Sequence, residues 1–210
     1  MYLVRFFSHS FRIPSKVLLK RKLSILFLIF LFVIGGGYFT YEGLKIEIKG
    51  KVAQILLQRS WHQTIKNGKK YQPWSSFDGV PIMRLTIPQH NINQIVLKGT
   101  SGQALAFGPS FHEESFLPQE EKVTIISSHR DSHGDYIKKL KFGEKIILQD
   151  ENGNWHTYII NDFFTINVKK ETFTIKTNEQ RLLLVTCFPF NSLQSGTPFR
   201  YVVSARKHLI

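Results

Sequence analysis

The sequence has one cysteine in 210 residues, Cys187, and this scarcity excludes several kinds of structure. A single thiol cannot form an internal disulfide, and one cysteine with scattered histidines does not provide the converging ligands of a metal site. The acidic pairs at 113–114 and 120–121 lack the alternating oxygen ligands of a calcium loop. We therefore expect no metal and no other cofactor. A lone thiol either packs as a small apolar side chain or has a chemical role.

The chain also lacks a long basic run outside its N-terminus, although its formal net charge is +13. Residues 1–22 hold six cations and no acid, whereas the later cations are interleaved with acidic side chains. Basic residues beside an apolar segment more often set membrane topology than bind phosphate. We therefore expect no nucleic-acid partner, and we interpret residues 1–22 as a basic cytoplasmic N-terminus.

An apolar segment without a charged residue follows at residues 23–39. Its 17 residues are at the lower limit of the roughly 17–25 that cross a bilayer as a helix. The preceding cations predict a single span, with the N-terminus inside and the C-terminal domain outside the cytoplasm. A cleaved signal peptide is the alternative. The long basic region and the absence of a clear small-residue cleavage site favour an uncleaved signal anchor.

A linker is expected between this segment and the main domain. Apolar residues at three- and four-residue spacing predict a helix over residues 51–66, and Gly68 is suited to end it. Residues 69–80 contain Pro, Gly and polar residues, which is typical of a surface crossing. We therefore interpret residues 40–80 as a helical linker and residues 81–210 as the main domain.

The main domain reads as β structure. Short runs rich in β-branched and aromatic residues alternate with turn signals, and Asn152-Gly153 supplies the turn of the clearest hairpin. Residues 99–121 are predicted to form a short helical turn and a long loop, which is a candidate lid. Eight strands indicate an all-β, closed or nearly closed fold. We expect these strands at residues 82–87, 93–98, 123–128, 144–149, 155–160, 162–168, 182–187 and 199–205.

Three residues with complementary chemistry lie at the ends of strand-like segments. Cys187 ends one apolar run, His129 follows another, and Arg200 lies in the next predicted strand. A thiolate attacks an amide or ester carbonyl, an imidazole protonates the leaving amine, and a guanidinium stabilises the oxyanion. The three residues are therefore candidates for thiol-based acyl transfer.

Three neighbouring residues are candidates for supporting roles. Ser128 and Thr186 are hydroxyl residues beside the histidine and the cysteine, and Asp131 could orient His129. Successive strand residues face opposite sides, so Thr186 and Cys187 cannot both point inward, and one of them is expected at a strand end or bend. Plainer interpretations stay open, because His and Arg are commonly exposed and Asp131 could simply begin a turn.

Taken together, these segments resemble the sortases, a family of membrane-anchored cysteine transpeptidases, over roughly residues 82–206. The family motif Thr-Leu-x-Thr-Cys is matched at 183–187, except that Leu183 replaces the first Thr. The histidine of the family follows a short apolar strand, as His129 does. Its arginine lies on the strand after the cysteine, as Arg200 does.

The motifs look most like those of the Gram-negative sortases, class GN. The similar segments are the Gly-rich run at 99–109, the His129-Arg130-Asp131 run, the run at 186–191 that contains the cysteine, and the arginine strand at 199–203. The resemblance implies an eight-stranded sortase-type β-barrel with short helices, preceded by a transmembrane helix. It also implies an inner-membrane location with the catalytic domain on the periplasmic side.

The resemblance further implies a two-step reaction. Cys187 would cleave the Thr–Gly bond of an LPXTG-like C-terminal sorting signal of an exported protein, and the thioacyl group would pass to an amine that the sequence does not identify. His129 would be the general acid and base, Arg200 the oxyanion or substrate-binding group, and Thr186 a contact of the substrate or transition state. Two alternatives remain: an exported cysteine hydrolase that uses water, and a non-catalytic membrane-anchored module that binds protein tails.

Overall fold

The described part of the chain comprises residues 15–99, 101–170, 179–192 and 196–208 of a computed structural model. Its strands are β1 (Pro81–Ile87), β2 (Ile92–Lys98), β3 (Ser110–Phe111), β4 (Val123–Ser128), β5 (Lys145–Gln149), β6 (Trp155–Asn167), β7 (Arg181–Phe188) and β8 (Phe199–Lys207). Its helices are α1 (Ser15–Asn67), α2 (Gly102–Phe107) and the short 3-10 helices η1 (Pro88–His90), η2 (Pro118–Glu120) and η3 (Asp135–Lys139).

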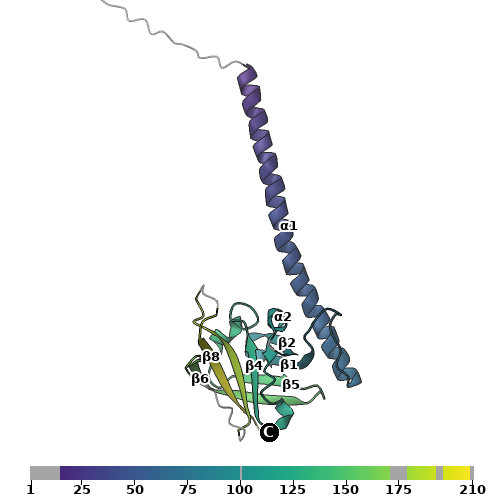
Figure 1. The fold of residues 1–210 in the computed structure, drawn as a ribbon, viewed down its shortest axis with the longest axis vertical. Coiled ribbons are helices and arrows are strands. Elements are labelled where there is room, and N and C mark those ends of the chain that lie inside the picture. The colour runs from purple at the N-terminus through teal and green to yellow at the C-terminus, as the bar shows by residue number, and fades with distance from the viewer. Residues whose placement is uncertain (1–14, 100, 171–178, 193–195, 209–210) are drawn as a thin grey trace, which may run out of the picture. The chain divides into compact units, whose positions relative to one another are not determined.

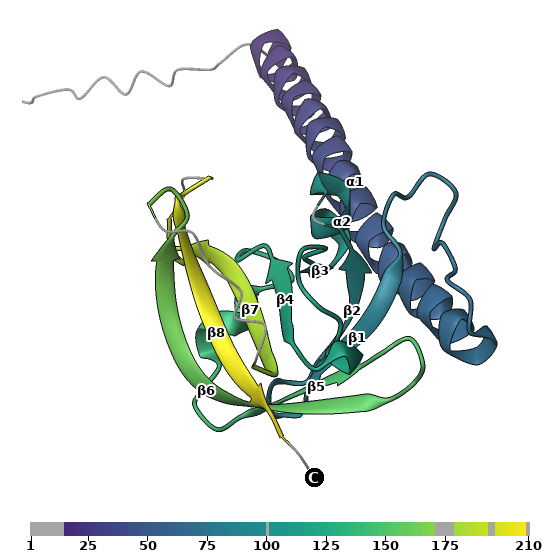
Figure 2. The ribbon, with the colours of Figure 1, turned by 60° about the horizontal axis from the view of Figure 1, so that its bottom comes forward.

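The strands close into a barrel in the order β1-β2-β3-β4-β7-β8-β6-β5, which confirms the predicted all-β, eight-stranded fold (Figures 1 and 2). Neighbouring strands are antiparallel except for β2 with β3 and β4 with β7, which are parallel. The parallel pair β4–β7 brings together two segments that lie about 60 residues apart in the sequence. Both strands therefore end at the same rim of the barrel.

Two strand predictions were wrong. The strands expected at 155–160 and 162–168 are the single strand β6, because a register shift between Ile160 and Asp162 accommodates Asn161 while the ladder with β8 continues. The segment 99–121 contains α2, β3 and η2 as well as loop. Strand β3 has only two residues, too few to produce a periodic pattern in the sequence.

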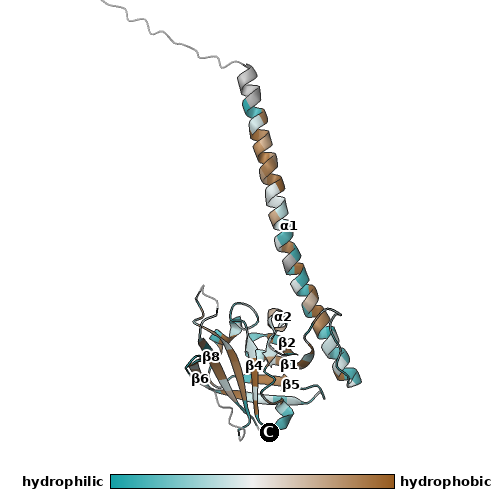
Figure 3. Cartoon of the chain, viewed as in Figure 1, coloured by the Kyte–Doolittle hydropathy of each residue, from teal (hydrophilic) through white to brown (hydrophobic). Residues whose placement is uncertain are grey.

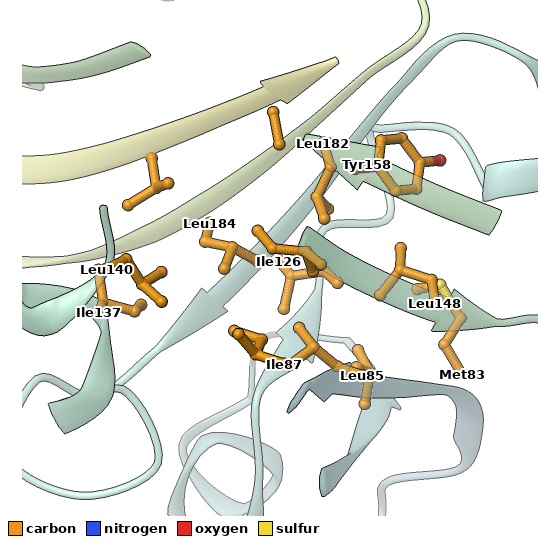
Figure 4. Close-up of a cluster of buried hydrophobic side chains, with 14 of the residues drawn as sticks. Met83, Leu85, Ile87, Ile126, Ile137, Leu140, Leu148, Tyr158, Leu182 and Leu184 are labelled. Carbon is orange, nitrogen blue, oxygen red and sulfur yellow. The ribbon is translucent and has the colours of Figure 1, made fainter. Parts of the chain in front are cut away.

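Alternate strand residues point into the barrel and form its core. The buried cluster includes Leu85 of β1, Ile126 of β4, Leu148 of β5 and Leu184 of β7 (Figure 4). Each of these side chains is at most 1% exposed. Burying such a side chain contributes roughly 1.5–3 kcal/mol, so the inward positions of the strands carry much of the stability.

The C-terminal part of α1, from Gly50 onward, belongs to the same compact unit as the barrel. Leu57 and Trp61 are fully buried and pack against Phe77 and against Leu97 of β2. The helix ends at Asn67, and Gly68 adopts a positive φ of 64° while its N–H donates to the carbonyl of Thr64. The helix predicted at 51–66 is confirmed as the end of a longer helix.

The N-terminal part of α1, up to Lys49, forms the other unit. Its large apolar side chains between Leu23 and Phe39 are all exposed, and they form a continuous apolar stretch on the helix (Figure 3). Among the described residues, α1 is the one helix long and apolar enough to cross a membrane. Residues 1–14 of the expected basic N-terminus lie outside the described residues.

Candidate active site

The strand register brings the three candidate catalytic residues to one rim of the barrel. Cys187 of β7 pairs directly with Arg200 of β8. Ser128, the last residue of β4, pairs with Thr186 in the parallel ladder. His129 and Cys187 are the next residues along these two strands, so they follow the last pair of the β4–β7 ladder at the same end.

Cys187 and its partners face outward. Thr186 is 2% exposed and points into the barrel, whereas the Cys187 side chain is partly exposed and His129 is exposed. Directly opposite residues of an antiparallel pair share a face, so Arg200 lies on the same outer face as Cys187. Both Thr186 and Cys187 lie within the ladder of β7, so the alternation is satisfied without the expected bend.

Ser128 and Thr186 lie on the inner side of the barrel wall and join β4 to β7 next to the site. The hydroxyl of Thr186 donates to the carbonyl of Ser128 over 2.8 Å, and both residues are buried. This bond ties β7 to β4 one residue before Cys187 and His129. The turn that follows favours glycine at position 134, because a Cβ there would stand 2.8 Å from the backbone carbonyl oxygen of His129 and 2.5 Å from the Ser128 hydroxyl oxygen.

The guanidinium of Arg200 is held by backbone carbonyls. Its Nη1 donates to the carbonyl of Phe199 over 2.9 Å and also to that of Thr197. In turn, the Thr197 hydroxyl donates to the carbonyl of Phe188 over 2.6 Å. The Arg200 guanidinium therefore has defined hydrogen-bond partners near the point where the backbone of Arg200 pairs with Cys187.

A groove of about 390 Å³ runs from Arg200 along the outer face of the barrel. Its floor consists of outward-facing apolar residues of four strands, and its rim includes polar side chains of the segment after β3. The lining residues are His112, Glu114, Ser115, Ile125, Ser127, Ile166, Val168, Leu183, Val185, Arg200 and Val202. Segment 99–121 thus contributes a wall of the groove, where the sequence predicted a lid.

The carboxylate of Asp131 contacts Arg130, whereas the sequence suggested that it could orient His129. Its carboxylate accepts a hydrogen bond from Nε of Arg130 over 3.3 Å, and the Asp131 side chain is 74% exposed. Among the described residues, Asp131 is paired with Arg130 and not with His129. Arg130 itself is buried, and no role was predicted for it from the sequence.

His133 is a second residue that the sequence did not single out. Burial lowers its pKa, a hydrogen bond with the carbonyl of Ala106 opposes this shift, and the nearby His129 lowers the pKa further. Its own carbonyl accepts a hydrogen bond from Nε2 of Gln94 over 3.0 Å. A half-buried histidine in the loop after β4 could have been found only from the tertiary contacts of that loop.

Within the described residues, no three His, Cys, Asp or Glu side chains gather in an arrangement that could hold a metal ion. The groups assembled at this rim are a thiol, an imidazole and a guanidinium. Together they provide a nucleophile, a proton carrier and a cationic hydrogen-bond donor, which are the requirements of acyl transfer through a thioester.

Comparison with known families agrees with this arrangement. The sequence pattern of the Sortase domain matches residues 85–208, which is more than half of the chain, and the chain therefore belongs to the sortase family. Sortase D of Bacillus subtilis (strain 168) is 25% identical over 123 residues, which are 59% of this chain. The chain spans about 62% of the length of that relative.

Solved structures show the same fold. A sortase D5 transpeptidase of Clostridium perfringens superposes with a TM-score of 0.60 at 17% identity, covering 76% of this chain and 99% of the other. A sortase C of Clostridium perfringens, solved with the C-terminal cell wall sorting motif, superposes with a TM-score of 0.53 at 18% identity. That match covers 81% of this chain and 97% of the other.

Proposed function

We propose that the chain is a membrane-anchored cysteine transpeptidase that cleaves an LPXTG-like C-terminal sorting signal and transfers the acyl group to an amine. The observation that carries this proposal is the outward pairing of Cys187 with Arg200 at the rim where His129 follows β4. Membership of the sortase family supports the same reaction class.

The first half of the reaction forms a thioester. The Cys187 thiolate attacks the carbonyl carbon of the Thr–Gly bond, and Arg200 donates hydrogen bonds to the oxyanion of the tetrahedral intermediate. His129, as imidazolium, gives its proton to the glycine nitrogen as the C–N bond breaks. The C-terminal fragment leaves with a free amine, and the remainder of the substrate stays on Cys187.

The second half reverses these roles. An acceptor amine attacks the thioester carbonyl, and His129 takes the proton that the amine loses. Arg200 again stabilises the oxyanion. The carbon–sulfur bond breaks, and the thiolate returns beside the imidazolium, ready for another cycle.

The groove supports a short apolar peptide as substrate. Leu183, Val185 and Val202 provide an apolar floor that leads to Arg200. The leucine and proline of a sorting signal would bury apolar surface against such a floor. The sortase C of Clostridium perfringens was solved with the C-terminal cell wall sorting motif, which supports this use of the groove.

The anchor and the class of enzyme are further parts of the proposal. The exposed apolar side chains between Leu23 and Phe39 support an uncleaved single-pass anchor, and the cations before them support an N-inside orientation. We propose an inner-membrane enzyme with a periplasmic catalytic domain and class GN character. A reporter fused after Ile210 is expected to be active only outside the cytoplasm, and cytoplasmic activity would exclude this topology.

Hydrolysis is the second candidate. His129 is exposed and the groove is open to solvent, so water can reach a thioester at this site. A hydrolase would release the free acid whether or not an amine is present. A transpeptidase would give an amide product whose yield rises with the amine concentration.

Intact-mass spectrometry of the full chain in detergent micelles tests the proposal. The protein would be incubated with a panel of LPXTG-like peptides, with and without a simple amine, beside Cys187→Ala. We expect a peptide adduct on Cys187 that the amine converts into a transfer product. If Cys187 reacts with no peptide and resists a thiol-directed electrophile as well, the non-catalytic tail-binding alternative would replace this proposal.

A further inference from the structure

Arg130 is a buried cation between two segments of the candidate active site. It follows His129 directly, and its side chain is only 6% exposed. Its Nη1 donates to the carbonyl of Pro189 over 2.7 Å, and its Nη2 donates to the carbonyl of Ser192. Both carbonyls belong to the segment that follows Cys187, about 60 residues further along the chain.

Burial of this guanidinium requires a reason. A cation in a protein interior is destabilising unless hydrogen bonds and opposite charge replace its hydration. The carboxylate that it contacts, Asp131, is largely exposed. Two of its contacts are the backbone carbonyls of Pro189 and Ser192, and the planar fork of a guanidinium suits two acceptors at once.

The segment after Cys187 is held from its other side by aromatic packing. Tyr201 of β8 lies 5.0 Å from Phe190 and 6.1 Å from Phe188, measured between ring centroids. The carbonyl of Phe188 also accepts the hydroxyl of Thr197. These contacts connect the segment to β8, the strand that carries Arg200, and to Thr197 just before it. Arg130 connects the same segment to the loop that carries His129.

We propose that Arg130 is a positioning residue that sets the placement of the His129 imidazole relative to the Cys187 thiol. This inference rests on the proposed function. Arg130 follows His129 directly, and its two hydrogen bonds reach the segment after Cys187. It therefore links the backbone beside the general acid to the backbone beside the nucleophile. Its loss would leave both strands intact but free their ends to move separately, and a misplacement of about 1 Å can cost roughly 100-fold in rate.

The test compares Arg130→Met and Arg130→Lys with the full-length protein in detergent. Met keeps much of the length of the side chain and removes all donors, whereas Lys keeps the charge and loses the fork. Arg59→Met is the matched control, because Arg59 is an exposed arginine of α1 in the same compact unit. Thermal midpoints establish which variants are folded at the assay temperature.

Two measurements separate positioning from a purely structural role. The first is the pH profile of Cys187 alkylation by iodoacetamide, which reports how the imidazole affects the thiol and needs no peptide. The second is the single-turnover rate of thioester formation at saturating peptide. We expect Arg130→Met to shift the pH profile toward that of His129→Ala and to lower the rate by about 10–100-fold with little change in KM. Arg130→Lys should give intermediate values.

A double variant sharpens the test. In a His129→Ala background, Arg130→Met should produce no further shift of the alkylation profile, because the imidazole that it positions is absent. If Arg130→Met does not fold, the Lys variant decides. A folded Arg130 variant with the wild-type profile and rate would overturn the inference, as would equal effects in the two backgrounds.

Failure of the proposed function would look different. If the wild-type protein forms no thioester with any peptide, while both Arg130→Met and His129→Ala shift the alkylation profile, the positioning role stands and the transpeptidase proposal falls. If wild-type transfer is normal and the Arg130 variants transfer equally well, the inference alone is overturned.

Discussion

The two faces of β7 differ in what their residues do. Inward residues such as Leu184 and Thr186 are almost fully buried and join the barrel core or its hydrogen bonds. Outward residues such as Val185 and Cys187 are partly exposed; Val185 lines the groove, and Cys187 pairs with Arg200, which also lines it. The inner face of β7 therefore belongs to the barrel core, whereas its outer face combines the buried Leu183 with the candidate nucleophile Cys187. Substitutions of adjacent residues should have effects of different kinds.

The largest effect is expected at the outer face. Cys187→Ala should abolish thioester formation, because no other cysteine exists in the chain to act as nucleophile. His129→Ala and Arg200→Ala should also abolish transfer, while the thermal midpoints of all three variants stay close to that of the wild type. Peptide-adduct mass spectrometry and thermal unfolding check these expectations. A variant that unfolds would show that the residue has a structural role. It would contradict the expectation that these three residues are not needed for stability.

The next effect is expected at the inner face. Leu184→Ala should lower the free energy of unfolding by about 2–5 kcal/mol, since it creates a cavity in the barrel core. Denaturant unfolding measures this change. The matched control is Val185→Ala on the outer face, which should cost less stability but weaken peptide binding. A larger stability loss for the Val185 variant would contradict the comparison.

A smaller effect tests the hydrogen bond beneath the site. Thr186→Val preserves shape but removes the donor to the carbonyl of Ser128, and the expected loss is about 1 kcal/mol of stability. The reverse exchange on the outer face, Val185→Thr, should leave stability nearly unchanged because that side chain is partly solvated. Equal losses in the two variants would show that the inner hydroxyl contributes nothing specific.

The smallest effect is expected on the pH dependence of stability. It concerns His133, which lies in the loop after β4 and so belongs to neither face of the sheet. The pKa of His133 is lowered from 6.5, mainly by burial, so the folded protein favours the neutral imidazole. Its contribution to stability is present above the unfolded pKa and is lost as the pH falls below about 6.5 toward the folded pKa. We expect His133→Gln to reduce the loss of thermal midpoint between pH 7.5 and pH 5. An unchanged pH dependence would exclude this role.

Much of the candidate site could be predicted because strand alternation and motif order are local properties. Cys187, His129 and Arg200 were selected from their places at strand ends, and the β4–β7–β8 register brings these strand ends to one rim. Their catalytic roles stay predictions. Within the described part of the chain, the carboxylate of Asp131 pairs with Arg130, and no contact there supports the orienting role considered for it.

Other features depended on contacts that no local pattern records. The sequence predicted a break inside β6, where a bulge at Asn161 keeps one long strand, and it missed the two-residue strand β3. Arg130 reads as an ordinary charged loop residue, yet it is buried against carbonyls about 60 positions away. His133 likewise reads as part of a turn.

The sequence by itself determined the apolar helix, the strand-rich domain and the chemical identity of the candidate nucleophile, because hydrophobic periodicity and residue type are carried by the chain directly. Only the tertiary structure decided which face of β7 bears the chemistry, which cation is buried and what forms the groove. These depend on strand register and on loop contacts between distant residues. A shift of one residue in that register would have turned Cys187 into the core and Thr186 toward the groove.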